Sequence, residues 1–198
     1  MTTLRTAFAT LAGPAVLALA TPAASQMQDL PNTGDNWTHE ATGTILPAQA
    51  GAFSRVSLRT YDDAGHDASA GYRMVNEDGM LIVSVYIYPG HKDFGCREIF
   101  EASRGHITNY EGERLLSEGG RESLLGNCAE THFARYLIPA GGVKANLPEL
   151  VSDLYLTCPE GNEWMVKYRA SWTGSEETFP SLDPLFDRIA WPVSLTGG

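Results

Sequence analysis

A nine-residue run, residues 80–88 (MLIVSVYIY), constrains the fold of this chain more than any other segment. Its residues are almost continuously apolar, β-branched or aromatic, and it lies between Asp78-Gly79 and Pro89-Gly90. A continuous apolar run of this length with turn residues at both ends is typical of a strand that is covered on both faces. The run therefore predicts a central strand with packing layers on either side.

Other strand patterns surround this run. Asp78-Gly79 predicts a hairpin that joins it to the preceding strand, because glycine takes the positive φ of a tight reversal. Residues 114–125 fit either a short extra hairpin or an irregular loop, with Gly119-Gly120 as its turn. The predicted strands are residues 42–46, 55–61, 71–75, 80–88, 127–138, 150–158 and 164–172.

Two helices are expected. Asp93 can cap a mid-chain helix, in which apolar side chains recur at three- and four-residue spacing as far as Tyr110. Residues 182–190 predict a second helix with Pro184 in its first turn. The order of four strands, helix, three strands and helix predicts an α+β fold, an antiparallel sheet of about seven strands with one long mid-chain helix and a C-terminal helix.

This layout resembles the PsbP-like α/β sandwich of exported and accessory proteins. Residues 55–58 (RVSL), 61–62 (YD), 70–72 (AGY) and 85–89 (VYIYP) also resemble a group of uncharacterised bacterial exported proteins. The resemblance covers about residues 41–192. It implies a fold more than an activity.

The first 25 residues have the pattern of a cleavable export signal. Arg5 supplies a positive n-region, residues 7–20 are mostly apolar, and the small residues 23–25 (AAS) precede the expected cleavage site. A membrane anchor needs about 20 strongly apolar residues, whereas this stretch is alanine-rich and broken by residues 13–14 (GP). No cysteine precedes Cys96, so no lipid anchor is expected. We therefore expect a periplasmic or secreted bacterial protein without stable membrane insertion.

The rest of the chain predicts a single domain. Residues 26–40 are polar with proline and glycine and predict a flexible leader, residues 41–192 form the expected domain, and residues 193–198 form a C-terminal tail. The formal net charge is −10. A negative surface repels nucleic acid and anionic lipid, so no nucleic-acid partner is expected.

Three cysteines in an exported chain predict one disulfide and one leftover thiol. If the two strands before Cys158 form a hairpin that pairs Ile138 with Glu149, Cys128 lies within one residue of the position opposite Cys158. That register can supply the Cα separation of roughly 5.5 Å that a bridge needs. We therefore expect a Cys128–Cys158 disulfide. Cys96, at the start of the mid-chain helix, is then either a reactive thiol or a small buried side chain on the sheet.

Cys96 also suggests an alternative function for the protein, that of a cysteine-dependent hydrolase. Cys96 would be the nucleophile, His132 the base, and Asp153 or Glu130 the orienting group. Papain-like and related cell-wall peptidases share the plan of a cysteine-bearing helix followed by a histidine-bearing antiparallel sheet. The local sequence at residues 94–98 (FGCRE) does not match their motifs.

The first hypothesis is a non-enzymatic module that binds a protein or a small ligand in the cell envelope at one end of the sheet. Binding groups are often displayed at strand ends and turns. The candidates chosen by that position are Tyr61, Asp62, Asp67, Tyr72, Tyr88 and His91.

Cofactor and metal signals are weak. The sequence has no nucleophile elbow, phosphate-binding glycine loop or dinucleotide fingerprint, so no cofactor is expected. Carboxylates in the segment Asp62, Asp63, His66 and Asp67 could bind calcium, but their spacing fits a solvated turn better. No metal is therefore expected.

An aromatic stripe runs along the last predicted strand. Side chains alternate between the two faces of a strand, so one face of this strand carries Trp164, Val166, Tyr168, Ala170 and Trp172. The stripe fits core beneath a helix better than a ligand platform.

Overall fold

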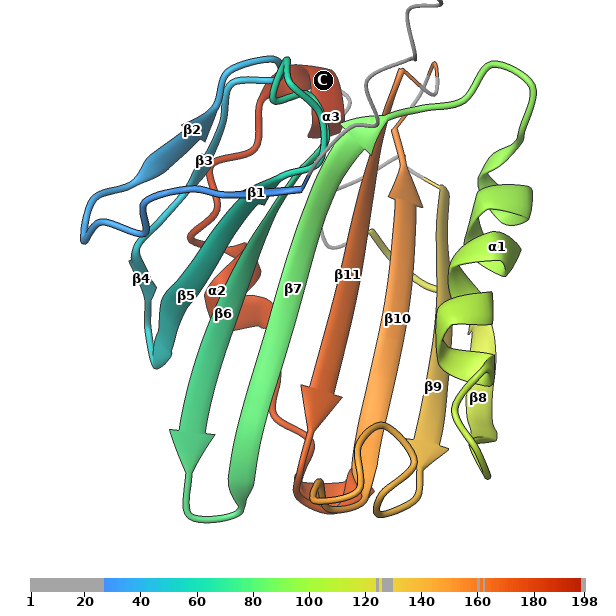
Figure 1. Cartoon of the computed structure of the whole chain (residues 1–198). Coiled ribbons are helices and arrows are strands. Elements are labelled where there is room, and N and C mark those ends of the chain that lie inside the picture. Colours follow the sequence, from blue (N-terminus) through green and yellow to red (C-terminus); the bar gives the residue numbers. More distant parts are fainter. Residues whose placement is uncertain (1–26, 124, 126–129, 160, 162, 197–198) are drawn as a thin grey trace, which may run out of the picture.

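One antiparallel sheet organises the structure, a computed structural model that describes residues 27–123, 125, 130–159, 161 and 163–196 (Figure 1). Its nine strands are β1 (Gln28–Asp29), β4 (Gln49–Ala50), β5 (Phe53–Thr60), β6 (Ala68–Asn76), β7 (Gly79–Pro89), β8 (Arg114–Gly120), β9 (Glu130–Ile138), β10 (Leu150–Cys158) and β11 (Trp164–Trp172). Their order across the sheet is β1-β5-β6-β7-β11-β10-β9-β8, and β4 pairs with β5. A separate hairpin is formed by β2 (Trp37–His39) and β3 (Thr44–Leu46).

The helices are short. They are α1 (Cys96–Thr108), α2 (Asp183–Phe186) and α3 (Val193–Thr196), with a single 3-10 turn, η1 (Glu176–Thr178). No helix of the described residues is long and apolar enough to cross a membrane.

The predicted central position of this strand is confirmed, but the predicted cover on both faces was wrong, because one face is covered only in part. β7 lies in the middle of the sheet between β6 and β11. Its odd-numbered residues from Leu81 to Ile87 are fully buried, whereas the residues of the other face are only partly buried. The sheet therefore has one closed face and one face that is open in part.

The β6–β7 hairpin differs in detail from its prediction. Asn76 pairs with Gly79, so the turn residues are Glu77 and Asp78, and the Asn76 side chain accepts hydrogen bonds from the amides of Asp78 and Gly79. A Cβ atom on Gly79 would lie 2.8 Å from Thr173 Oγ1 and 2.9 Å from the backbone nitrogen of Gly174. Glycine is thus required here by a close approach of the chain after β11 and not by a positive φ.

The closed face carries the larger core. Alternate residues of β5, β6, β7 and β11 pack there against the β2–β3 hairpin and the chain that follows β11. The aromatic stripe of β11 belongs to this core, as predicted, and the rings of Tyr168 and Phe186 of α2 lie 4.4 Å apart. Burial of these side chains is the main stabilising term of this layer.

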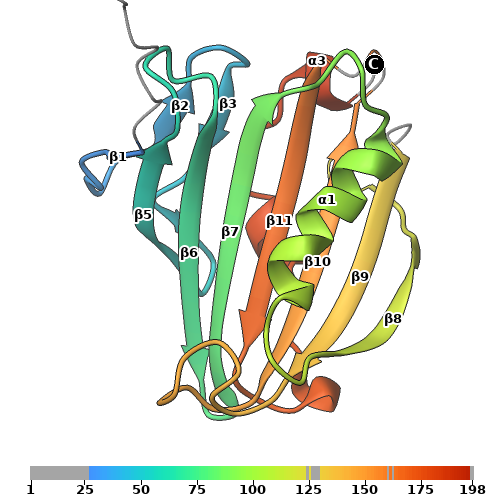
Figure 2. The same ribbon diagram turned by 45° about the vertical axis from the view of Figure 1, so that its right-hand side comes forward.

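Helix α1 covers part of the opposite face. Phe100 and Ile107 of α1 pack on Tyr136 of β9 and on Leu154 and Leu156 of β10. Figure 2 shows α1 in front of β10 and β9, while β6 and β7 lie beside it without a helix over them. The face of the sheet on which α1 lies is therefore open over β6 and β7. We call it the α1 face, or open face, in contrast to the closed face that carries the larger core.

The predicted fold class was wrong. The protein is mostly antiparallel sheet with nine strands in place of about seven, and the single long mid-chain helix is not seen, because α1 has 13 residues. Residues 182–190 do not form a continuous helix. Their apolar spacing is met by turns, in which Leu185, Arg188 and Ile189 each donate to the carbonyl three residues earlier. Residues 114–120 form an edge strand on β9, which is neither of the two alternatives considered for them.

Residues 27–40 fold onto the sheet and do not form the flexible leader that was expected. The buried Arg55 side chain donates to the carbonyl oxygens of Thr33, Asp35 and Leu46 and to Asn32 Oδ1, at 2.6–3.1 Å. A buried guanidinium must find acceptors for its five N–H groups, and this segment supplies most of them. The expected tail also packs, since Leu195 of α3 is buried. The predicted export signal lies outside the described residues.

The predicted disulfide was wrong as well. Cys158 is bonded to Cys96, with Cα atoms 5.9 Å apart, and Cys128 lies outside the described residues. β7 and β10 are both antiparallel to β11, so they run in the same direction and both finish at the same end of the sheet. The chain leaves β7 at that end of the sheet and begins α1 there, which places Cys96 over the end of β10. The β9–β10 register is also shifted by one residue, with Leu150 opposite Ile138.

Candidate functional site

A groove of about 640 Å³ lies on the open part of the α1 face, between α1 and strands β7 and β11. The side chains that give it chemical character are Tyr61, Asp67, Tyr86, Tyr88, Phe94 and Lys167. Concave sites of 300–1,000 Å³ with aromatic walls and few polar groups are typical of small-molecule sites. The groove has the size and composition of a ligand site.

Strand alternation places these side chains. On β7 the even-numbered residues, including Tyr86 and Tyr88, point away from the closed core. On β11 the odd-numbered residues share this face, and Lys167 is the direct cross-strand partner of Tyr86. Lys167 of β11 therefore lies beside Tyr86 and Tyr88 of the adjacent strand β7.

Lys167 is the most unusual group in the groove. Its Nζ atom lies 4.6 Å from the centre of the Tyr86 ring and 5.4 Å from that of Tyr88. Burial lowers the pKa of Lys167, and the nearby Asp67 carboxylate only partly opposes this. Within the described residues no carboxylate comes within ion-pair distance of its ammonium. A partly buried cation that contacts ring faces and has no ion-pair partner among the described residues is open to an anionic ligand.

Asp67 supplies the opposite charge. Burial raises the pKa of Asp67, and the carboxylate of Asp62 acts in the same direction, while Lys167 lowers it. Burial therefore makes both Asp67 and Lys167 costly to charge.

A second cation extends the positive side of the groove. Arg169, two residues further along β11, lies 5.3 Å from the centre of the Tyr110 ring and donates to the Tyr110 hydroxyl at 3.3 Å. It lines an adjoining cavity of about 280 Å³, which shares Tyr61, Tyr86 and Lys167 with the groove. Two cations therefore lie on one face of β11, in a chain whose net charge is −10.

The six predicted binding residues divide into two groups. Tyr61, Asp67, Tyr88 and His91 line the groove. Asp62 holds the turn before β6 instead, since its Oδ1 accepts a hydrogen bond from the His66 amide at 2.8 Å.

Tyr72 is fully buried on the closed face, where its hydroxyl donates to the carbonyl of Pro47 at 3.0 Å. It was wrongly expected at the surface, because its place near a strand end was read without its face of the sheet. Tyr72 is a core residue.

Tyr86, Phe94, Lys167 and Arg169 were missed as site residues. The sequence carries a signal for the two cations, because they alternate with the aromatic stripe of β11. A period of two therefore assigns both to the face opposite the closed core.

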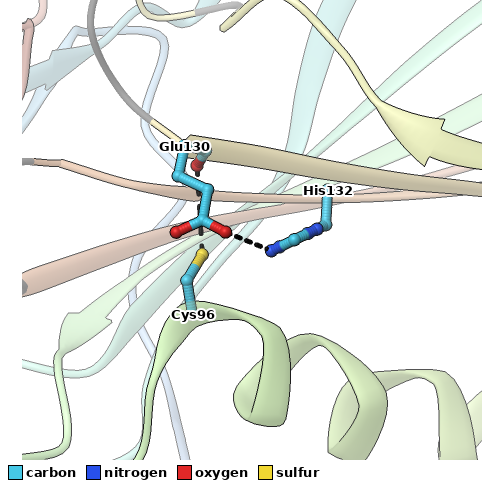
Figure 3. Close-up of side chains that lie close together, drawn as sticks. All are labelled: Cys96, Glu130 and His132. Atoms are coloured by element: carbon cyan, nitrogen blue, oxygen red, sulfur yellow. Dashed lines mark hydrogen bonds and ion pairs between the residues drawn. The ribbon is translucent and has the colours of Figure 1, made fainter.

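The structure brings together three residues of the hydrolase hypothesis, Cys96, Glu130 and His132 (Figure 3). However, Cys96 is bonded to Cys158 and is 4% exposed, so it offers no thiolate in this state. Asp153, the other proposed orienting group, lies on the opposite face of the sheet in an ion pair with Arg135. The arrangement is therefore that of a disulfide with polar neighbours and not of a working catalytic triad.

The chain matches no protein-family model, no curated protein and no solved structure. The resemblance to the PsbP-like sandwich therefore stays a prediction.

Proposed function

We propose that the protein binds a small carboxylate with an aromatic or aliphatic body in the groove between α1 and strands β7 and β11. The observation that carries the proposal is Lys167, a partly buried ammonium that faces two tyrosine rings without an ion-pair partner among the described residues. A ligand carboxylate would supply the missing counter-charge. Its apolar body would lie against the aromatic walls.

The chemistry of the groove favours a single negative charge. A charge-assisted hydrogen bond from Lys167 would contribute about 1.5–3 kcal/mol. Asp67 lines the same groove and would repel a second anionic group. Because Tyr86, Tyr88 and Phe94 line the groove, a ring or an alkyl chain can pack against aromatic surfaces there.

The proposal is for a binding role in an oxidising compartment. A buried structural disulfide is typical of exported proteins, and Cys96 and Cys158 form one here. We therefore place the binding function in the periplasm or outside the cell.

Calorimetric titration tests the proposal with matched pairs of ligands. Phenylacetate, indole-3-acetate and decanoate are compared with their primary amides, which keep the apolar body and lose the charge. At least one acid is expected to bind about tenfold to a hundredfold more tightly than its amide, which is the ratio that 1.5–3 kcal/mol gives.

Two lysine variants complete the test. Lys167→Met removes the ammonium and is expected to abolish the preference for the acid. Lys144→Met is the matched control, because Lys144 is exposed in the β9–β10 loop, away from the groove. Equal binding of acids and amides, or an unchanged preference in Lys167→Met, would show that the proposal is wrong.

A further inference from the structure

Four side chains that can bind a metal meet where α1 begins over the end of β10. Ligand atoms of Cys96, Glu130 and His132 lie within 4.8 Å of one another, and Cys158 is joined to Cys96 by the disulfide. Figure 3 shows the first three side chains converging from α1 and β9. We propose that reduction of the disulfide creates a zinc site formed by the thiolates of Cys96 and Cys158, His132 and Glu130.

The sheet register fixes three of these ligands. Glu130 of β9 lies directly opposite Cys158 of β10, and His132 follows two residues later on the same face. Cys96 is the first residue of α1, which packs on that face. The positive end of the helix dipole would also stabilise thiolates there.

His132 is oriented as a ligand would be. Its Nε2 atom is shielded from solvent and lies 2.8 Å from Glu130 Oε1, but the approach does not meet hydrogen-bond geometry, so the atom lacks a hydrogen-bond partner among the described residues. Its ring lies 5.3 Å from that of Phe100, which limits its rotation. A buried nitrogen that points at a carboxylate without a hydrogen bond is a position at which an ion would bind both groups.

The donor set selects the metal. Thiolate and imidazole favour zinc over magnesium or calcium, and zinc takes four such ligands in a tetrahedron. Bond lengths of about 2.0–2.3 Å place tetrahedral ligand atoms roughly 3.3–3.8 Å apart, so the cluster must contract by about 1 Å at its widest. The two sulfurs must also move apart, which requires that the bond between them is broken.

Reduction supplies both thiolates. With a trialkylphosphine and water, the disulfide becomes two thiols and the phosphine becomes its oxide. Each thiol then loses its proton when zinc binds. In the oxidised protein neither sulfur carries a negative charge, so the same residues form a covalent staple and no zinc site.

The surroundings allow a metal ion to enter from one side. Cys96 and Cys158 are 4% and 3% exposed, whereas the Glu130 side chain is 62% exposed. Glu130 therefore connects the buried sulfurs to solvent. The site is separate from the carboxylate groove, whose lining includes none of these four residues.

The test is a metal titration of the full-length exported form before and after reduction. The protein is treated with the phosphine, freed of it without oxygen, and titrated with Zn²⁺ against a chromophoric chelator, and in parallel with Co²⁺. One equivalent of zinc is expected to bind the reduced form alone. Cobalt is expected to give the thiolate charge-transfer band and the intense visible bands of a tetrahedral site.

Variants assign the ligands. Cys158→Ser and His132→Ala are each expected to weaken zinc binding at least about 100-fold, the upper range for loss of a supporting group around a metal. His106→Ala, on the last turn of the same helix, and Cys128→Ser are the matched controls and are expected to bind as the wild type does.

Four results would overturn the proposal. They are no zinc binding by the reduced protein, equal binding by His132→Ala, loss of binding in Cys128→Ser, and a reduced protein that is unfolded by circular dichroism and not refolded by zinc. The last would contradict the proposal because two of the ligands are held in place by strand β9 of the folded sheet.

Discussion

Two buried charges lie on neighbouring strands but on opposite faces of the sheet, and their surroundings differ. Asp153 of β10 is fully buried on the closed face, where Arg135 donates to both carboxylate oxygens at 2.7 and 2.8 Å. Lys167 of β11, on the open face, has ring faces and no ion pair among the described residues. One charge is neutralised within the fold, and the other is not.

This difference separates a charge with an ion-pair partner from one without. The Arg135 guanidinium offsets part of the cost of removing the Asp153 carboxylate from water, although burial still raises the pKa of Asp153. An ammonium without an ion-pair partner has no comparable compensation. The two faces should therefore respond in opposite ways to neutral substitutions.

The largest effect is expected for Asp153→Asn. The variant leaves the Arg135 guanidinium with only the partly exposed carboxylate of Glu176, at 3.4 Å, and breaking a buried pair costs about 3–5 kcal/mol. The free energy of unfolding is measured by urea titration with tryptophan fluorescence. The double variant Asp153→Leu with Arg135→Met should recover most of the loss, because no uncompensated charge remains. A loss in Asp153→Asn below about 1 kcal/mol would mean that the pair behaves like an exposed salt bridge.

Removing the disulfide tests how the open face is held. The variant Cys96→Ala with Cys158→Ala should lose about 2–4 kcal/mol, because the bridge closes a long loop in the unfolded chain between residues 62 positions apart. Hydrogen exchange should rise first in α1 and stay slow in β6 and β7. Cys128→Ser should be neutral. An equal loss in Cys128→Ser would contradict the Cys96–Cys158 pairing.

Local patterns predicted the strands well where one face is core. The predicted limits of residues 150–158 and 164–172 agree with β10 and β11. In β11 the buried aromatic residues alternate with Lys167 and Arg169, so both the strand and its two faces can be read from the sequence. The short turns at residues 182–190 could not be predicted from the sequence, because apolar residues spaced by three or four fit a helix as well as they fit successive turns.

Long-range features were not predictable in the same way. The disulfide depends on the strand order β7-β11-β10, which joins strands distant in sequence and puts Cys96 beside Cys158. The flexible leader was predicted from the polarity of residues 26–40. No local pattern in that segment indicates that Arg55 donates hydrogen bonds to its carbonyl oxygens and so holds it on the sheet. The groove has the same origin, since Tyr61, Tyr88 and Lys167 meet only after the sheet has formed.

Lys167→Met should have the opposite sign to Asp153→Asn. Replacing an unpaired, partly buried ammonium by an apolar side chain of similar length should stabilise the protein by about 1 kcal/mol, while the preference for a carboxylate over its amide is lost. Urea titration and calorimetry measure the two effects on one sample. A variant that is less stable than the wild type by more than about 1 kcal/mol would make Lys167 a structural residue and remove the contrast between the two faces.

The smallest effect is the pH dependence of the difference in stability between Lys167→Met and the wild type. Burial lowers the pKa of Lys167 below its ordinary value of 10.5, so between the lowered pKa and 10.5 the unfolded chain binds more protons than the folded one. Stability of the wild type must then rise with pH in this window, because the folded lysine loses its charge first. The advantage of Lys167→Met should therefore shrink as the pH rises from neutrality toward 10.5. Paired urea titrations of the wild type and the variant along a pH series measure this difference. An advantage that grows with pH would mean that the folded protein stabilises the Lys167 charge.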